Sequence, residues 1–260
     1  MQVDLTGKVA LITGASKGLG KAMAHRFALS GADIVMMARN PDVLHATARE
    51  IATDTGRKVR GYVCDVSHAT TLEQAYKTIQ KDFPVIDILV NNAGSSARSP
   101  VANLTHDMLF ADIDLKISPA LRLVQLVLPA MREQRWGRIL NVVNIGAKAP
   151  QPGSAPTSMT RAAGIAMTKV MAHEFARHNI LVNALCVGRI RSEQWVRNHL
   201  RDHPEVSFEE YLRERSADIP LGRMGEAQEF AQIACFLASD LASYITGTAI
   251  NVDGGASPVV

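Results

Sequence analysis

The sequence predicts an α/β protein: a single doubly wound domain in which a seven-stranded, mainly parallel sheet carries helices on both faces. Short β-rich runs alternate with helical patterns along the whole chain. Several of these runs are almost continuously apolar, and a glycine-rich turn joins the first run to the first helix. Parallel strands that are buried on both faces are typically continuous apolar runs. Strand, helix and strand at this spacing connect as right-handed βαβ units, which form an open parallel sheet.

Seven segments are predicted as strands because they are short, mostly apolar and rich in β-branched residues. They are Val9–Thr13, Asp33–Ala38, Val59–Cys64, Ile86–Val90, Arg138–Ile145, Ile180–Cys186 and Thr248–Val252. In the first helical pattern, Leu19, Met23 and Phe27 recur every four residues and form one stripe of a helix, which Gly31 is expected to end. The other helical patterns are Pro41–Thr55, Thr70–Asp82, Thr105–Gln134, Thr157–His178 and Ala227–Leu237.

One segment, about Gly188–Gly222, is irregular and follows the sixth predicted strand. It contains a polar helix pattern, and we interpret it as a lid inserted into the domain. No repeat, low-complexity tract or linker divides the chain. Residues 1–260 are therefore expected to form one domain, which the length permits.

The composition excludes several classes of function. With 28 Lys and Arg against 25 Asp and Glu, the net charge is only +3, too small to predict a nucleic-acid partner. The three cysteines form no CxxC pair, which excludes a disulfide framework and a zinc ribbon, and no metal site is expected. No run approaches the 18 apolar residues of a membrane span, and the first residues do not resemble a signal peptide. We expect a soluble, cytoplasmic protein that contacts neither membrane nor nucleic acid.

The turn after the first strand predicts a dinucleotide site. It reads Thr13-Gly14-Ala15-Ser16-Lys17-Gly18-Leu19-Gly20 and leads directly into a helix. Glycines at such a turn let backbone N–H groups approach a pyrophosphate, and the helix N-terminus adds partial positive charge. Gly14, Ser16, Gly18, Leu19 and Gly20 are therefore candidate cofactor-binding residues.

The end of the second strand favours NADP(H) over NAD(H) as the cofactor. An acidic residue usually binds the ribose 2′-hydroxyl there, but this chain has Arg39 and Asn40, and Lys17 lies in the glycine turn. Arginine can hold a 2′-phosphate through two hydrogen bonds. The alternative is that Arg39 and Lys17 are solvated surface cations, and loss of the 2′-phosphate preference in Arg39→Asp would argue against it.

With these features the sequence resembles the short-chain dehydrogenases/reductases of the single-domain type. The shared motifs are the glycine turn, Cys64-Asp65-Val66, Asn91-Asn92-Ala93-Gly94, Asn183 with Gly188, Ile219-Pro220-Leu221-Gly222-Arg223, Ser239-Asp240, Tyr244-Ile245-Thr246-Gly247 and Val252-Asp253-Gly254-Gly255. They occur in the family's order across the chain. The resemblance implies a Rossmann fold, hydride transfer to or from a small molecule, and a homo-oligomer, either a dimer or a tetramer.

The resemblance also implies roles for residues along the cofactor cleft. Asp65 and Val66 are expected to contact the adenine, and Asn92, Ala93 and Gly94 to line the cleft. Ile190, which follows Gly188, is expected to contact the nicotinamide amide through its backbone. The chain departs from the family at Val187, where relatives usually have proline, and at Ser192, where they often have threonine.

The family's catalytic Asn-Ser-Tyr-Lys tetrad is replaced throughout. Register with the family motifs places Thr157 on the tyrosine, Arg161 on the lysine and Asn144 on the serine. In ungapped register the asparagine position falls on Lys116, and Asp114 would require a shift of two residues. We therefore take Lys116, Asn144, Thr157 and Arg161 as the candidate catalytic residues.

These four residues differ sharply in what they can do with a proton. Thr157 is an aliphatic alcohol and a far weaker acid than a phenol. Arg161 keeps a positive charge that can orient ribose hydroxyls or an anion, but it does not release its protons. Asn144 can donate a hydrogen bond to a carbonyl oxygen. Lys116 is the one candidate proton donor of the four, and burial near Arg161 would lower its pKa.

Three functions remain open from the sequence. The first is an NADP(H)-dependent oxidoreductase in which Lys116, Asn144 or water handles the proton. The second is a non-catalytic NADP(H)-binding sensor or partner subunit, and the third is a non-redox enzyme on the same scaffold. The sequence does not identify the small-molecule substrate.

Overall fold

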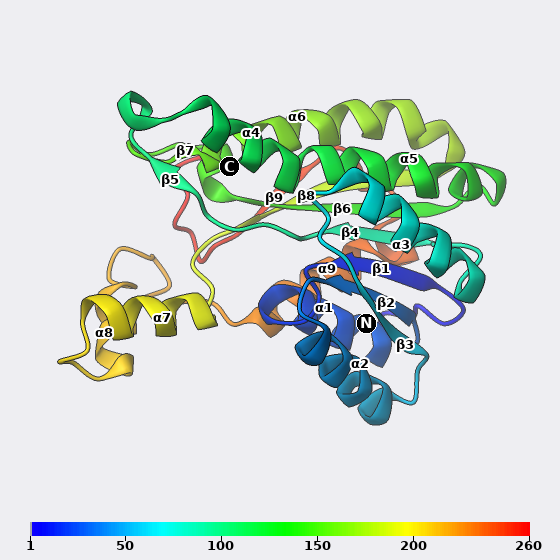
Figure 1. The fold of residues 1–260 in the computed structure, drawn as a ribbon, viewed down its shortest axis with the longest axis horizontal. Helices are drawn as coiled ribbons and strands as arrows, with labels where there is room; N and C mark the ends of the chain where they lie inside the picture. Colours follow the sequence, from blue (N-terminus) through cyan, green and yellow to red (C-terminus); the bar gives the residue numbers. More distant parts are fainter. Residues whose placement is uncertain (1) are drawn as a thin grey trace.

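The computed structural model describes residues 2–260 and shows one seven-stranded sheet between two layers of helices (Figure 1). Its strands are β1 (Val9–Thr13), β2 (Asp33–Ala38), β3 (Val59–Val63), β4 (Ile88–Asn91), β6 (Gly137–Asn144), β8 (Ile180–Val187) and β9 (Ala249–Val252). They lie in the order β3-β2-β1-β4-β6-β8-β9, and all neighbouring pairs are parallel. The predicted doubly wound, single-domain α/β fold is confirmed.

The two helical layers cover opposite faces of this sheet (Figure 1). One layer contains α1 (Gly18–Leu29), α2 (Pro41–Thr55) and α9 (Ala227–Leu237). The other contains α3 (Ala69–Asp82), α4 (His106–Lys116), α5 (Ser118–Glu133) and α6 (Thr157–Phe175). Each face of the sheet therefore has its own apolar core.

The side chains of β1 alternate between the two apolar cores on opposite faces of the sheet. Ala10 and Ile12 pack with Phe27 of α1, whereas Leu11 packs on the opposite face with residues such as Leu123 of α5. All five of these side chains are completely buried. Successive residues of a strand point to opposite faces, so burial of both faces requires the continuous apolar run that the sequence contains.

One predicted helix is wrong in its extent: Thr105–Gln134 is two helices, not one. Helix α4 ends at Lys116, and α5 begins at Ser118, with Pro119 in its first turn. Proline has no backbone N–H to donate, so it is favoured where a new helix begins. The break places Lys116 at the C-terminal end of α4, which faces the site described below.

Other predicted boundaries are corrected by a few residues. The third strand ends at Val63, the fourth is Ile88–Asn91, the fifth long strand is Gly137–Asn144, the sixth ends at Val187 and the last begins at Ala249. Helix α3 begins at Ala69, and α6 ends at Phe175, followed by a 3₁₀ turn over Ala176–His178. The sequence analysis missed a short antiparallel pair, β5 (Arg98–Ser99) with β7 (Ala155–Pro156).

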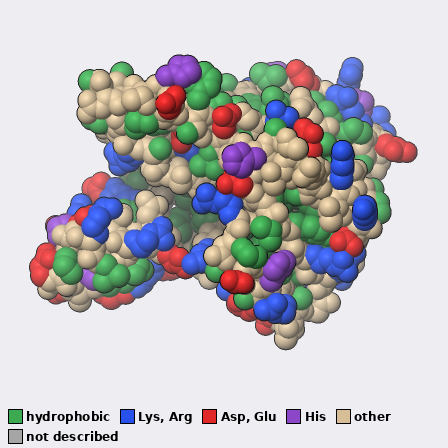
Figure 2. Space-filling view, viewed as in Figure 1, with side chains coloured by type: hydrophobic (Ala, Val, Ile, Leu, Met, Phe, Trp, Pro, Cys, Tyr) green, Lys and Arg blue, Asp and Glu red, His purple; other side chains and the backbone are tan. Residues whose placement is uncertain are grey.

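The segment predicted as a lid contains α7 (Glu193–Asp202) and α8 (Phe208–Glu214). In Figure 1 these helices project from the body of the protein, and Figure 2 shows a hollow between them and the body. The segment has a small core, which includes Tyr211, Leu212 and Ile219. Within residues 2–260, no helix is both long enough and apolar enough to cross a bilayer.

Candidate active site

The glycine-rich turn connects β1 to α1 at the carboxyl edge of the sheet. Gly14 and Gly18 both have positive φ angles, +63° and +53°, a conformation that glycine adopts without strain. Gly20 has a different role, because a Cβ atom there would lie 2.2 Å from the carbonyl oxygen of Gly14. The turn therefore closes tightly on itself and leaves the N-terminal end of α1 open to a ligand.

Hydrogen bonds join this turn to the segment after β4. The Thr13 hydroxyl accepts from the backbone N–H groups of Asn92 at 3.0 Å and Ala93 at 2.9 Å. In return, the Asn92 amide donates to the carbonyl oxygens of Thr13 and Gly14 at 2.9 and 3.2 Å. Asn92 thus fixes the turn rather than facing the cleft, while its neighbour Ala93 lines it.

A cavity of about 480 Å³ lies above the turn and brings together most of the predicted cofactor residues. It is lined by Gly14, Ser16, Lys17, Arg39, Asn40, Asp65, Val66, Ala93 and Gly94, among others. Gly18, Leu19, Gly20, Asn92, Gly188 and Ile190 are not among its lining residues. Gly188 instead packs against Asp253, where a Cβ atom would lie 2.5 Å from the Asp253 Cβ. Ile190 lines a neighbouring cavity beside the segment that contains α7 and α8.

The two cations predicted to bind a 2′-phosphate both reach this cavity. Arg39 is 76% exposed in its side chain, and its Nη1 lies 3.9 Å from Asp65 Oδ2. The Lys17 ammonium lies 2.9 Å from Glu193 Oε2, in the first turn of α7. Lys17 therefore links the glycine turn to the predicted lid.

Lys116 and Thr157 meet although they come from different helices. Lys116 ends α4 and Thr157 begins α6, and the Lys116 Nζ donates to the Thr157 hydroxyl at 2.7 Å. The Lys116 side chain is only 5% exposed. A third residue, Asp112, accepts from Lys116 Nζ with both carboxylate oxygens, at 2.5 and 2.7 Å. The sequence analysis missed Asp112, although a carboxylate four residues before a lysine is a signal for a helical ion pair.

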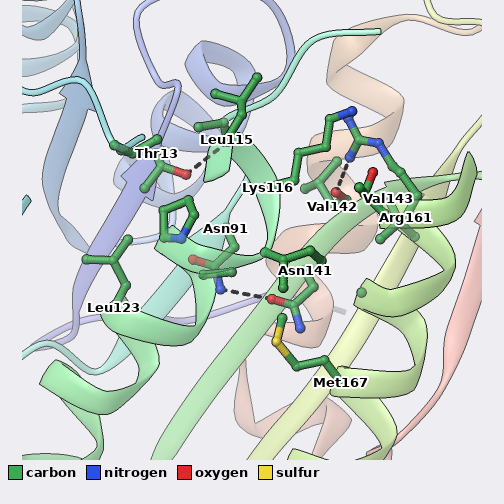
Figure 3. A pocket seen from close by; sticks show the side chains of 17 residues that line it. Thr13, Asn91, Leu115, Lys116, Leu123, Asn141, Val142, Val143, Arg161 and Met167 are labelled. Carbon is green, nitrogen blue, oxygen red and sulfur yellow. Dashed lines mark hydrogen bonds between the residues drawn. The ribbon is translucent and has the colours of Figure 1, made fainter. Parts of the chain in front are cut away.

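Arg161 lies beside Lys116 in the same buried region (Figure 3). A Cβ atom on Gly94 would lie 3.0 Å from Arg161 Nη2 and 3.7 Å from Lys116 Cε, so both side chains border the cleft at Gly94. Arg161 Nη1 donates to the carbonyl oxygen of Val142 at 2.5 Å, while its Nε has no hydrogen-bond partner among residues 2–260. Burial lowers the pKa of Lys116, and the Arg161 charge lowers it further, whereas the Asp112 carboxylate opposes both effects.

Asn144 stands apart from the other three candidates. It ends β6, and its buried Oδ1 has no hydrogen-bond partner in the described part of the chain. A Cβ atom on Gly146 would lie 3.4 Å from that oxygen and 3.1 Å from the Ser158 hydroxyl, so Asn144 faces the Gly146 turn near Ser158. Within residues 2–260, no hydrogen bond joins the Asn144 side chain to Lys116, Thr157 or Arg161.

Beneath these residues lies a chain of neutral polar side chains that the sequence analysis did not identify. Asn91 donates to Asn141 at 2.9 Å, and Asn141 donates to Thr168 at 2.9 Å (Figure 3 shows the first bond). A small cavity of about 30 Å³, bordered by Lys116 and Arg161, separates this chain from the charged residues. Over the described part of the chain, no cluster of His, Cys, Asp and Glu could hold a metal ion.

Comparison with known proteins decides the family. The family described as enoyl-(acyl carrier protein) reductase matches residues 14–257. The chain belongs to this family, the short-chain dehydrogenases/reductases. This short-chain dehydrogenase/reductase is 34% identical over 264 residues to the 3-oxoacyl-(acyl-carrier-protein) reductase FabG of Aquifex aeolicus, covering 98% of this chain and 99% of the relative. It is also 34% identical over 254 residues to the oxidoreductase UcpA of Escherichia coli K12, covering 97% and 95% of the two chains.

Solved structures extend the comparison to the whole fold. L-Sorbose reductase from Gluconobacter frateurii, in complex with NADPH and L-sorbose, superposes with a TM-score of 0.96 and 31% identity over 100% of both chains. YwfH, an NADPH-dependent reductase involved in bacilysin biosynthesis, superposes with a TM-score of 0.90 and 29% identity over 97% of this chain and 99% of its own. The family resemblance found in the sequence is confirmed by these relatives.

Proposed function

We propose that this short-chain dehydrogenase/reductase is an NADP(H)-dependent oxidoreductase that interconverts a carbonyl and a hydroxyl group on a small molecule. The observation that carries the proposal is the 2.7 Å hydrogen bond from Lys116 Nζ to the Thr157 hydroxyl at the edge of the cofactor cleft. It joins a buried lysine to the hydroxyl of Thr157, the residue that the sequence register assigns to the family's tyrosine position. The proton route is therefore proposed to differ from that of the family's usual tetrad.

The residues of the cleft fit a dinucleotide with a 2′-phosphate. The glycine turn can close against the segment after β4 only while Gly14 and Gly20 carry no Cβ, and Lys17 and Arg39 bring two cations to the cavity that Gly14 lines. L-Sorbose reductase, similar over its whole length, was solved with NADPH, which supports the same choice here. When bound, NADPH would supply the hydride. Asp65, Val66, Ala93 and Gly94 are proposed to border it, with Gly188 and Ile190 at the nicotinamide end.

The proton is proposed to pass from Lys116 through Thr157. A hydroxyl can accept one hydrogen bond and donate another at the same time. As hydride reaches the carbonyl carbon, the Thr157 proton moves to the substrate oxygen, and Lys116 replaces it from its ammonium group. The Thr157 hydroxyl ends as it began, and Lys116 ends neutral. Thr157 needs no low pKa of its own, because it is never left as an alkoxide.

Arg161 and Asn144 are given roles that need no proton release. Arg161 keeps its charge, and no residue that the structure describes accepts from its Nε–H, so it is proposed to orient the cofactor ribose or an anionic group of the substrate. The Asn144 amide is proposed to donate a hydrogen bond to the substrate oxygen. The segment from about 188 to 222 is proposed to act as a lid over this cleft.

The first experiment is a fluorescence titration of the cofactor-free protein with NADPH and, in parallel, with NADH. We expect NADPH to bind more tightly, and Arg39→Asp to remove that preference. Lys116→Ala should then abolish reductive turnover of ketoses and 3-oxoacyl thioesters while the affinity for NADPH is retained. Absence of binding of either nucleotide would overturn the proposal, and unchanged turnover in Lys116→Ala would overturn the role of Lys116.

A second candidate is a non-catalytic NADP(H)-binding sensor or partner subunit. It is favoured by one observation: both carboxylate oxygens of Asp112 accept hydrogen bonds from Lys116, whose side chain is only 5% exposed. A non-catalytic sensor or partner subunit requires NADPH binding without turnover and a stable complex with another chain. A non-redox enzyme would instead form product without a change in cofactor absorbance.

We also propose that the protein is a homo-oligomer, a dimer or a tetramer. Leu121 on α5 and Val170 on α6 are exposed apolar side chains on the long helices through which the family resemblance implies association. Size-exclusion chromatography with light scattering is expected to give a mass above that of one chain. A monomer would contradict the proposal.

A further inference from the structure

Asp112 is a buried carboxylate that the family's tetrad does not include. It lies one helical turn before Lys116 on α4 and is only 3% exposed. Its Oδ1 accepts from Lys116, and its Oδ2 accepts from both Lys116 and the Thr160 hydroxyl, the latter at 2.6 Å. A carboxylate taken out of water is stable only with such partners. Asp112 is therefore fixed from two helices, by Lys116 on α4 and by Thr160 on α6.

The Asp112 carboxylate hydrogen-bonds to one cation, Lys116, and acts on a second, Arg161, through its charge alone. The charged groups that act on Lys116 are Asp112 on its own helix and Arg161 on α6, while the loop packed against it contributes the uncharged Gly94. Asp112, Lys116 and Arg161 together carry one excess positive charge while Lys116 is protonated. If Lys116 gives up its proton, the negative charge of Asp112 and the positive charge of Arg161 balance. If the Asp112 charge were absent, two buried cations would face each other.

We infer that Asp112 is a positioning residue that keeps Lys116 protonated and aimed at the Thr157 hydroxyl, with Thr160 holding Asp112 in place. This inference rests on the proposed function, because it concerns the proton route of the same site. Three of the four hydrogen bonds that define the route end on Asp112, and the fourth joins Lys116 to Thr157. The counter-ion of Lys116 is therefore Asp112, four residues earlier on the same helix.

The charge of Asp112 sets the direction of the expected effect. Burial and Arg161 both lower the pKa of Lys116, and Asp112 raises it. Asp112→Asn therefore lowers the pKa of Lys116 further, and a larger fraction of the lysine is neutral at a given pH. The alkaline limb of the pH profile for reduction should move to lower pH. A purely structural role for Asp112 would lower activity at all pH values and leave the limb in place.

The direct test uses the cofactor-free protein and does not depend on turnover. Protein labelled with ¹³C-lysine is titrated by NMR, and the Lys116 resonance is assigned by its loss in Lys116→Met. We expect Asp112→Asn to lower the Lys116 midpoint by about one pH unit or more. Asp114→Asn is the matched control, because Asp114 lies on the same helix but is exposed and bonded to Ser118. An unchanged or raised midpoint in Asp112→Asn would overturn the inference.

A second pair of variants separates charge from position. Thr160→Val keeps the Asp112 charge and removes one of its anchors, so we expect kcat to fall several-fold while the alkaline limb stays in place. Thr160→Ser keeps the hydroxyl and should restore most of the activity. If Asp112→Asn does not fold, as judged by circular dichroism, this pair still tests the anchor. Wild-type activity in Thr160→Val would show that the anchor has no such role.

These outcomes distinguish the inference from the proposed function. A wild-type protein that binds NADPH but reduces no carbonyl would refute the oxidoreductase, whatever the NMR midpoints show. A wild-type enzyme that turns over, with an alkaline limb that Asp112→Asn does not move, would refute the role of Asp112 alone.

Discussion

Glu193 in α7 forms an ion pair with Lys17 in the glycine-rich turn, with 2.9 Å between its Oε2 and the Lys17 Nζ. The contact joins residues 176 positions apart and connects the proposed lid to the cofactor cleft. Both side chains are more than half exposed, so the pair contributes less than about 1 kcal/mol to stability. The pair matters for cofactor binding, because Lys17 is one of the two cations proposed to bind the 2′-phosphate.

Glu193→Gln is expected to tighten NADPH binding by about 2- to 5-fold and to leave NADH binding nearly unchanged. The carboxylate competes with the 2′-phosphate for Lys17 and repels it, and an exposed interaction of this kind is worth a few tenths to one kcal/mol. The effect should be larger at low salt, since exposed charges are screened. Fluorescence titrations at two salt concentrations measure it, with Glu209→Gln as control, because Glu209 pairs with Arg191 instead. An equal gain for NADH would refute the competition.

Much of the fold could be predicted from local patterns in the sequence. Val9–Thr13 and Asp33–Ala38 were predicted to the residue, because a strand buried on both faces needs an unbroken apolar run. The break at Ile117 was missed because the apolar period continues across it, although Pro119 marks the start of a new helix. The pair of β5 with β7 has only two residues in each strand, too few for a period, and tertiary contacts alone define it.

Part of the site could likewise be predicted from local sequence patterns, and part is visible only in the packed structure. The cavity at the proposed cofactor site could be predicted because strands β1, β2 and β4 end at one edge of the sheet, which brings their following residues together. The spacing of Asp112 and Lys116 is visible in the sequence, but such pairs are usually solvated. Only the packing of α4 against α6 shows that this pair is buried and that Thr157 and Thr160 complete it.

Thr157→Val is expected to lower kcat for reduction by about 100-fold or more, because it removes the hydroxyl that is proposed to pass the proton from Lys116 to the substrate. The variant has nearly the same shape, so the affinity for NADPH should change little. Thr157→Ser keeps the hydroxyl and should retain most of the activity. Steady-state kinetics and cofactor titrations of both variants provide the test. Equal activity in Thr157→Val and the wild type would show that Lys116 reaches the substrate without Thr157.

The two reaction directions are expected to depend on pH with opposite sign. In the proposed route reduction needs protonated Lys116, so its rate falls as the pH rises through the pKa of Lys116, which burial and Arg161 place below the usual range for lysine. Oxidation needs the neutral amine, so its rate rises over that interval. Profiles of kcat in both directions measure this. Lys116→Arg keeps a charge but cannot release a proton, so it should be inactive in both; an active Lys116→Arg would contradict the mechanism.

Two buried arginines are expected to respond to substitution by methionine with opposite sign. Arg161 forms no ion pair within residues 2–260, and burial lowers its pKa, which means that the charged form is costly where it lies. Arg161→Met should therefore raise the free energy of unfolding by about 1 kcal/mol or more, since a well-packed apolar side chain can replace a buried charge at a gain. The same change should weaken cofactor binding, because the site loses a cation beside Gly94.

Arg138 is the control for Arg161, because it is also a buried arginine, only 1% exposed, but it forms an ion pair. Its guanidinium lies 2.9 Å from Asp240 Oδ1 and donates to the carbonyl oxygens of Gly137 and Asn179. Arg138→Met removes the ion pair with Asp240 and the hydrogen bonds of the buried guanidinium, and should lower the free energy of unfolding by about 2 kcal/mol or more. Urea denaturation of both variants gives the comparison. A loss of stability in Arg161→Met as large as that in Arg138→Met would mean that Arg161 is retained for folding rather than for the site.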